Sequence, residues 1–258
     1  MNSKAVKTTR VPEEVHPPED SYWLSSRRPL NILVFLAPFL LFYEIGLVFL
    51  LREDRGTITN LAHEWIISFM GVFNVDFFGL SLPGFIVVVV LLLWHVFSLE
   101  PWRVDFRSIP LMLLESLLLM VPLIVLSHMV RQFMPLAGSE GELIETLGPM
   151  GRIAVSIGAG LYEELVFRML VVLVIHTLMV DVLKFSDLIG AGVAILVSAG
   201  LFTWYHPVWG PDGTASMGKM LFYFAAGLWF GVLYVARGFG IVVAVHAFYD
   251  IAVLLDWD

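Results

Sequence analysis

The fold is decided by residues 153–180, which read IAVSIGAGLYEELVFRMLVVLVIHTLMV. This stretch is long enough to cross a bilayer, because a spanning helix needs about 20 predominantly apolar residues. Three ionisable side chains, Glu163, Glu164 and Arg168, lie within it. Each such group costs about 2.5–3.5 kcal/mol at the bilayer centre on insertion scales. We therefore expect them to face the interior of a helix bundle or a water-filled cavity.

The rest of the chain has the composition of a membrane protein. Of its 258 residues, 59% are hydrophobic and 15% are charged, whereas soluble domains have about 45–50% apolar and about 25% charged residues. The apolar residues gather in seven runs without the alternation of barrel strands. We therefore predict an all-α fold, a polytopic transmembrane helical bundle with about seven to eight spans. The predicted spans are residues 30–51, 78–99, 109–133, 153–180, 188–205, 217–236 and 241–255.

Two other segments are less apolar. Residues 1–29 are polar and do not resemble a signal peptide, since the apolar run that follows is too long and has no small-residue cleavage site after it. Residues 57–73 are expected to form either an interfacial helix or part of an eighth span. Because there is no internal repeat, we predict a polar amino-terminal segment at 1–29 and a single transmembrane domain at 30–258.

Some residues inside the runs are expected to shape the bundle. Pro38, Pro83 and Pro122 lie in or near the starts of spans, where they are expected to kink the helices. Glu44 and Glu115 also lie in spans, and either can hold a hydrogen bond between helices.

The distribution of basic residues predicts the orientation, because cytoplasmic loops carry an excess of Lys and Arg. With a cytoplasmic amino terminus, the cytoplasmic side holds nine: Lys4, Lys7, Arg10, Arg27, Arg28, Arg103, Arg107, Lys184 and Arg237. The opposite side holds five: Arg52, Arg55, Arg131, Arg152 and Lys219. We therefore predict an integral, multi-pass membrane protein with a cytoplasmic amino terminus. Tryptophans and tyrosines near the span ends, Tyr205 among them, are interpreted as an aromatic belt.

Several classes of function are excluded. The chain has no cysteine, which rules out disulfide scaffolds, thiolate metal sites and a cysteine nucleophile. The net charge is −8 and no run of Lys or Arg is present, so nucleic acid is not an expected partner. Ser156 and Ser198 lie in spans, but the Gly-x-Ser-x-Gly elbow of a serine nucleophile is missing.

Helix geometry separates the two glutamates. Glu164 and Arg168 are four residues apart and can pair on one helical face. Glu163 points about 100° further round the same helix, so it needs a partner from another helix. Two later spans offer candidates: one ends in Phe202-Thr203-Trp204-Tyr205-His206, and the other contains His246 and, four residues later, Asp250.

Glutamate, two histidines and an aspartate are compatible with three chemistries. A carboxylate desolvated in a membrane becomes a competent general base that activates water. Two histidines and a carboxylate also form a known catalytic zinc set, although a His-Glu-x-x-His motif is missing. Buried carboxylates and histidines make proton relays in carriers as well.

The combination of Glu163-Glu164-x-x-x-Arg168, Phe202-x-x-x-His206 and His246-x-x-x-Asp250 resembles the CPBP intramembrane proteases, which include CAAX prenyl proteases and bacteriocin-processing or immunity proteins. The resemblance covers about residues 150–255. It implies an intramembrane endopeptidase, in a bacterial inner or plasma membrane, that hydrolyses a membrane-associated or carboxyl-terminal peptide. Its partners would be the peptide or protein substrate and the lipid bilayer.

The resemblance also implies roles for residues. Glu163 would be the general base and would position the water with His206, while His246 and Asp250 would form the oxyanion side. The supporting residues would be Glu164, Arg168 and Phe202. No cofactor is favoured, and zinc is the alternative, with Glu163, His206, His246 and Asp250 as its ligands. The prenyl proteases have asparagine where Asp250 stands, which raises the chance of a metal ligand there and puts CAAX cleavage itself in doubt.

Two alternatives to the metal-free protease stay open from the sequence. One is a zinc-dependent version of the same protease. The other is a non-catalytic membrane protein, either a carrier or an immunity protein, that uses the same polar pocket. The oligomeric state is not predicted.

Overall fold

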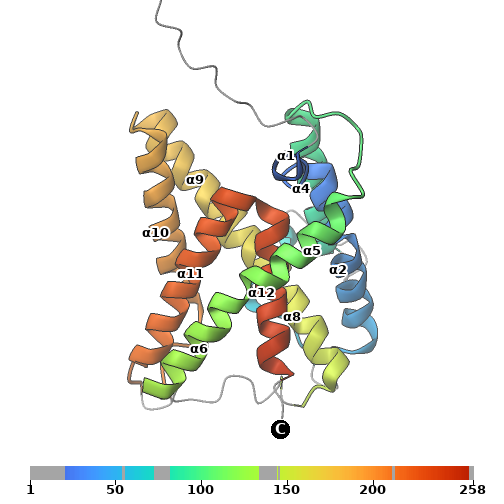
Figure 1. Ribbon diagram of the computed structural model, residues 1–258. Coiled ribbons are helices and arrows are strands. Elements are labelled where there is room, and N and C mark those ends of the chain that lie inside the picture. Colours follow the sequence, from blue (N-terminus) through green and yellow to red (C-terminus); the bar gives the residue numbers. More distant parts are fainter. Residues whose placement is uncertain are drawn as a thin grey trace, which may run out of the picture.

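The computed structural model describes residues 21–53, 56–72, 82–133, 144, 146–210 and 213–255. These residues form a bundle of helices that cross one another at varied angles (Figure 1). The helices of the first half are α1 (Tyr22–Ser25), α2 (Pro29–Phe49), α3 (Leu61–Gly71), α4 (Leu82–Phe97), α5 (Ser108–Leu119) and α6 (Val121–Phe133). A short antiparallel pair, β1 (Arg52–Glu53) and β2 (Gly56–Thr57), separates α2 from α3. The predicted all-α membrane fold is confirmed.

The second half of the chain holds the longest continuous helical rod. It consists of α8 (Pro149–Glu164), a π-helical segment η1 (Leu165–Val171), α9 (Val172–Thr177) and a second π-helical segment η2 (Leu178–Val182). Three more helices follow: α10 (Asp187–Tyr205), α11 (Met217–Arg237) and α12 (Phe239–Leu254).

The helices correspond to the predicted spans, with differences in length. Five helical segments among the described residues are long and apolar enough to cross a membrane: Pro29–Phe49, Ser108–Gln132, Pro149–Val182, Asp187–Tyr205 and Met217–Arg237. Two others are shorter apolar helices, Pro83–Phe97 and Phe239–Leu254. Residues 78–81, where the second predicted span begins, and residues 1–20 of the polar amino-terminal segment lie outside the described residues.

Helix α3 tests the prediction for residues 57–73. It has 11 residues, which gives a length of about 16 Å, too short to cross the hydrocarbon core of a bilayer. It packs against α8 and α4 and exposes Leu61, Trp65 and Phe69. Within the described residues, the interfacial-helix alternative therefore fits and the eighth span does not.

The three prolines act differently. Pro122 is the second residue of α6 and marks the break between α5 and α6, because proline has no N–H to continue the helix hydrogen bonding. Pro83 is likewise the second residue of α4. Pro38 lies inside α2, and the helix continues on both sides of it.

Helix α12 lies at the centre of the bundle and packs against α8, α5, α11, α2 and α6. Every residue from Phe239 to Ala247 is buried, which is typical of a helix that is apolar on all sides. Helix α8 approaches it at Gly160, where an added Cβ atom would lie 2.7 Å from the carbonyl oxygen of Val243. This close approach brings the carboxyl end of α8 against the middle of α12.

A separate ionic cluster fixes the amino-terminal end of the bundle. The guanidinium of Arg237 on α11 pairs with the carboxylate of Glu115 on α5 at 2.5 Å, and it lies 3.8 Å from the ring centroid of Trp23. Tyr22 donates a hydrogen bond to the same carboxylate. Glu115 therefore does bond between helices, as the sequence suggested.

Candidate active site

Glu163 and Glu164 end α8, and the backbone widens into the π-helix η1 directly after them. Segments of π-helix inside α-helices are frequent at functional sites. The carboxyl groups are buried, with Glu163 5% exposed and Glu164 fully enclosed. Arg168, within η1, is fully enclosed as well.

Glu164 contacts both an arginine and a histidine. One carboxylate oxygen lies 3.1 Å from Nε of Arg168, which is the ion pair expected from their spacing. The other oxygen lies 2.7 Å from Nδ1 of His246 on α12. Because a carboxylate only accepts hydrogen bonds, Nδ1 of His246 is the donor, and its Nε2 is left to face the pocket.

The guanidinium of Arg168 is enclosed by aromatic rings. Its central carbon lies 4.3 Å from the ring centroid of Phe202 and 5.1 Å from that of Phe230. One of its nitrogens donates to the carbonyl oxygen of Gly227 at 3.3 Å. These contacts compensate for the loss of water around a buried cation.

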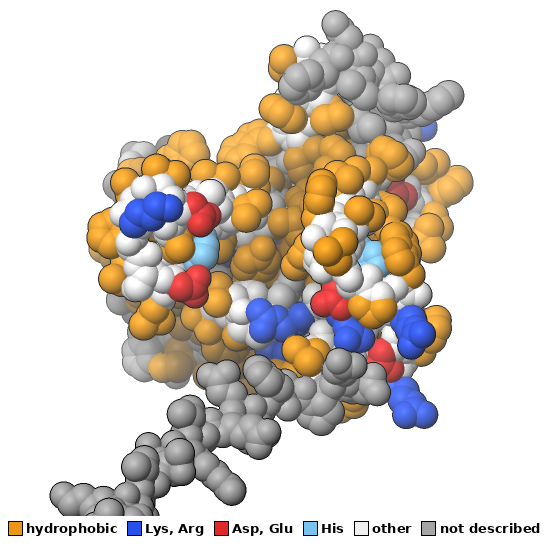
Figure 2. All heavy atoms as spheres, turned by 90° about the horizontal axis from the view of Figure 1, so that it is seen from above, with side chains coloured by type: hydrophobic (Ala, Val, Ile, Leu, Met, Phe, Trp, Pro, Cys, Tyr) orange, Lys and Arg blue, Asp and Glu red, His pale blue; other side chains and the backbone are white. Residues whose placement is uncertain are grey.

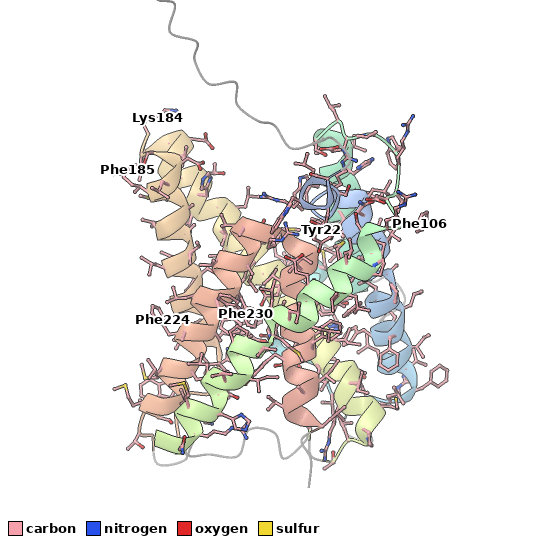
Figure 3. All side chains as sticks on the ribbon, viewed as in Figure 1. Tyr22, Phe106, Lys184, Phe185, Phe224 and Phe230 are labelled. Atoms are coloured by element: carbon pink, nitrogen blue, oxygen red, sulfur yellow. The ribbon has the colours of Figure 1, made fainter. Side chains whose placement is uncertain are left out.

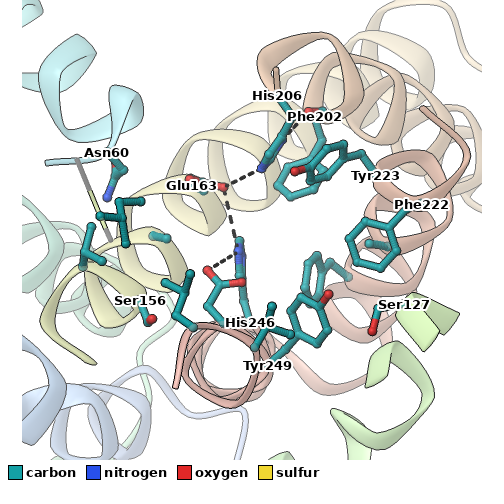
Figure 4. A pocket seen from close by; sticks show the side chains of 18 of the residues that line it. Asn60, Ser127, Ser156, Glu163, Phe202, His206, Phe222, Tyr223, His246 and Tyr249 are labelled. Atoms are coloured by element: carbon teal, nitrogen blue, oxygen red, sulfur yellow. Dashed lines mark hydrogen bonds and ion pairs between the residues drawn. The ribbon is translucent and has the colours of Figure 1, made fainter. Parts of the chain in front are cut away.

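Glu163 faces two imidazoles from other parts of the chain, as the dashed lines in Figure 4 show. Its Oε2 atom lies 3.7 Å from Nε2 of His206 and 3.8 Å from Nε2 of His246. Its Oε1 atom accepts a hydrogen bond from the hydroxyl of Tyr205 at 3.2 Å. Among the described residues, Oε2 is buried without a hydrogen-bond partner.

His206 is placed by the end of α10. The following residue is Pro207, which disfavours a helical conformation for the residue before it, and His206 is extended with φ −84° and ψ 154°. Its Nδ1 donates to the carbonyl oxygen of Phe202 at 2.8 Å, which leaves Nε2 directed at Glu163. The ring stacks on Tyr223 with 4.0 Å between centroids.

His246 and Asp250 occupy one face of α12, as their spacing predicted. Nε2 of His246 lies 3.4 Å from Oδ2 of Asp250. The imidazole also stacks on Phe230 of α11 at 4.7 Å between centroids, and Figure 3 shows Phe230 midway along α11. Three carboxylates, from Glu163, Glu164 and Asp250, therefore surround one imidazole.

A cavity of about 620 Å³ is lined by Glu163, Phe202, His206, His246 and Asp250, among other residues. Its walls come from α6, α8, α10, α11 and α12, and residues just before α3 also contribute. Arg131 near the end of α6 and Lys219 in the first turn of α11 line it too. The carboxyl ends of α6 and α12 and the amino ends of α8 and α11 lie at one edge of the bundle, the lower edge in Figure 1. The cavity therefore extends from the buried carboxylates to this end of the molecule.

The zinc alternative has specific geometric requirements. A catalytic zinc site needs three protein donors arranged around one point with an open fourth position. In the part of the chain that the structure describes, no group of three or more His, Asp or Glu side chains is arranged so that it could hold a metal ion. The donors Glu163, His206, His246 and Asp250 are neighbours, but they do not form such a set here.

All seven residues selected from the sequence meet in or beside this cavity. Glu163, Glu164, Arg168, Phe202, His206, His246 and Asp250 come from three separate helical segments. The sequence interpretation missed Tyr205, which was assigned to an aromatic belt. Its hydroxyl instead contacts Glu163. Its position next to His206 was the available signal, but the direction of its side chain depends on how α10 packs.

Comparison with known proteins agrees with this geometry. Residues 147–252 match the family model described as type II CAAX prenyl endopeptidase Rce1-like. Over these residues the chain is similar to the CPBP/CAAX protease family. The matched region begins just before α8 and ends within α12, so it contains all seven residues selected from the sequence of this CAAX protease-like protein. No curated protein and no solved structure matched the chain.

The match of residues 147–252 to the CAAX protease family indicates the general activity. The family is one of proteases, and with several membrane-spanning helices the chain is an integral membrane protein. A protease of this family acts on membrane-associated peptides. The comparison does not extend to the first three spans, which precede residue 147.

Proposed function

We propose that the protein is an intramembrane endopeptidase in which Glu163 activates a water molecule. The observation that supports this proposal is the buried Oε2 atom of Glu163, which lacks a hydrogen-bond partner among the described residues. A buried polar atom of this kind is normally satisfied by ordered water. The Nε2 atoms of His206 and His246 lie 3.7 and 3.8 Å from this Oε2 atom, beyond direct hydrogen-bond distance, so a water bound to Oε2 would also lie near both rings.

In the proposed reaction Glu163 takes a proton from the water, and the oxygen adds to the carbonyl carbon of the scissile peptide bond. The carbonyl oxygen becomes an oxyanion. Glu163 then returns the proton to the leaving nitrogen as the C–N bond breaks, which restores the carboxylate and releases a carboxylic acid and an amine. His206 holds the water through Nε2.

His246 supplies the oxyanion donor in this proposal. As an imidazolium it donates from Nε2, while the carboxylates of Glu164 and Asp250 balance its charge at 2.7 and 3.4 Å. Preorganised donors of this kind give the largest stabilisation of a tetrahedral intermediate. In this proposal Asp250 acts as a carboxylate, so an aspartate at the position where the prenyl proteases have asparagine is compatible with the mechanism.

The proposed substrate is a carboxyl-terminal or membrane-anchored peptide segment. The cavity is within the range of about 300–1,000 Å³ typical of ligand sites and is lined by Phe222, Tyr223, Phe230 and Tyr249. These aromatic side chains suit an apolar segment, prenylated or not.

The activity test uses protein reconstituted in liposomes with quenched fluorogenic peptides, with and without a farnesylated cysteine. Glu163→Gln should lower kcat at least about 10³-fold, in the range for loss of a general base, while the variant remains folded. Glu100→Gln is the matched control, because Glu100 is partly exposed and pairs with Arg28. Full activity of Glu163→Gln would contradict the proposal, and ion-coupled uptake without hydrolysis would favour a carrier.

Metal dependence has its own measurement. We expect activity to survive dialysis against a chelator, with less than stoichiometric metal by elemental analysis. Stoichiometric zinc whose removal abolishes activity would overturn the metal-free mechanism.

The proposed orientation places the amino terminus in the cytoplasm of a bacterial cell. Figure 2 looks onto the end of the bundle that contains α1, where Lys and Arg side chains gather. The cavity reaches the opposite end. Because the chain has no cysteine, single-cysteine variants report orientation directly. Ala215→Cys should react with a membrane-impermeant maleimide added outside intact cells, whereas Arg103→Cys should react only after lysis; the reverse pattern would invert the orientation.

A further inference from the structure

The hydroxyl of Tyr205 is held between two groups from different parts of the chain. It donates to Oε1 of Glu163 at 3.2 Å, and it accepts a hydrogen bond from the backbone N–H of Ala62 at 3.0 Å. Because an amide N–H can only donate, the single proton of the hydroxyl is free to point to the carboxylate.

The donor comes from the first turn of α3, where backbone N–H groups have no partner within the helix. The helix cap uses one of them, since Oδ1 of Asn60 accepts from the N–H of His63 at 2.8 Å. The N–H of Ala62 is directed to Tyr205 instead. The amino end of the short interfacial helix is thus connected through one hydroxyl to the buried Glu163.

The ring of Tyr205 is fixed as firmly as its hydroxyl. It makes edge-to-face contacts with Trp65 of α3 and Phe167 of η1, with centroid separations of 5.2 and 5.1 Å. Contacts of this geometry favour one ring orientation. Elements α3, η1 and α8 therefore all help to determine where the hydroxyl lies.

The two carboxylate oxygens of Glu163 therefore have different partners. Oε1 is occupied by Tyr205, and Oε2 is the atom that faces His206 and His246. We propose that Tyr205 is a positioning residue for Glu163, which holds the carboxylate so that Oε2 meets the water. This inference rests on the proposed function of Glu163. Tyr205 is not part of the described cavity lining, so it acts through Glu163 and not on the substrate.

Several charged and titratable groups surround Glu163 and Tyr205. Glu163 is faced by Glu164 on its own helix, by Arg168 in η1, by His206 beyond α10, and by His246 and Asp250 on α12. Tyr205 is faced in addition by Glu64 of α3. A variant at Tyr205 changes none of these groups, so a change in pH dependence can be assigned to the lost hydrogen bond.

Tyr205→Phe is the test, because it keeps the ring and removes only the hydroxyl. We expect kcat to fall about 10- to 100-fold, the usual effect of losing a hydrogen bond to a charged group, with KM unchanged. The acidic limb of the pH–kcat/KM profile should move to higher pH, since the ionised form of Glu163 loses a donor. Tyr234→Phe on α11 is the matched control.

A second measurement does not depend on activity. Infrared difference spectra recorded over a pH titration should contain a carboxyl band of Glu163, identified by its loss in Glu163→Gln. In Tyr205→Phe this band should shift, and in Tyr234→Phe it should not. An unshifted band, or a loss of activity explained by a lower Tm with an unchanged pH profile, would overturn the proposal. If the native protein has no peptidase activity but the band still shifts in Tyr205→Phe, the proposed function is rejected while the contact between Tyr205 and Glu163 is supported.

Discussion

Glu164 bonds His246 across the α8–α12 interface at 2.7 Å while its other oxygen lies 3.1 Å from Arg168. One carboxylate thus orients the imidazole of the site and balances a buried guanidinium. Partners of this kind fix the tautomer and the ring orientation of a histidine. Besides its expected contact with Arg168, Glu164 therefore directly contacts an imidazole of the proposed catalytic site.

Removal of the Glu164 charge should affect stability and activity separately. Glu164→Gln leaves Arg168 buried without its counter-charge, which typically costs about 3–5 kcal/mol, and should lower Tm strongly. The double variant Glu164→Gln/Arg168→Met should recover much of the stability, because the unpaired cation is gone. It should stay poorly active, because His246 still lacks its carboxylate partner. Recovery of both Tm and kcat would show that the contact to His246 has no role.

Asp250→Asn distinguishes the two hydrolytic mechanisms. In the metal-free mechanism the variant should keep kcat within about tenfold of the native value, because Glu164 still balances the charge of His246 and no metal ligand is lost. The new amide can also donate a hydrogen bond to the oxyanion. Asp250→Ala is the comparison and should be less active. If Asp250 were a zinc ligand, Asp250→Asn would release metal and lose activity together, as elemental analysis would reveal.

Gly160 allows the close approach of α8 and α12. A Cβ atom there would lie 2.7 Å from the carbonyl oxygen of Val243, so Gly160→Ala should push the helices apart and weaken the contact between Glu164 and His246. We expect a lower Tm and a lower kcat. Gly192→Ala on α10 is the control, since nothing lies within 4 Å of an added Cβ, and it should be neutral or stabilising by about 1 kcal/mol. Equal changes in Tm and kcat for Gly160→Ala and Gly192→Ala would contradict a specific role of Gly160 in the approach of α8 and α12.

His63 on the interfacial helix α3 predicts a pH dependence of stability. Burial lowers the pKa of its imidazole from 6.5 to about 4. The unfolded chain therefore binds more protons than the folded chain between these values, and stability falls as pH drops from 6.5 towards 4. His63→Asn should weaken this dependence, measured as the difference in Tm between pH 7.5 and pH 4.5 in detergent. An unchanged difference would show that other groups cause it.

The sequence by itself determined the class of fold and the local pairs. Apolar runs of membrane-spanning length predict a helical bundle, because every backbone polar group must be paired within the bilayer. A spacing of four residues predicted that Glu164 and Arg168 are neighbours, and likewise His246 and Asp250, because 3.6 residues make one helical turn. The cost of burying charge also predicted that Glu163 needs a partner from another helix. These inferences depend only on helix geometry and on the properties of the bilayer.

The tertiary structure decided which helices meet, and therefore which partners are real. The contact between Glu164 and His246 needs α8 and α12 to approach at Gly160, and no local spacing encodes that approach. The contact between Tyr205 and Glu163 needs the end of α10 to lie against α8 and the first turn of α3. Interhelical packing depends on side chains far apart in sequence, so a tyrosine assigned to the membrane interface became a neighbour of the proposed catalytic base.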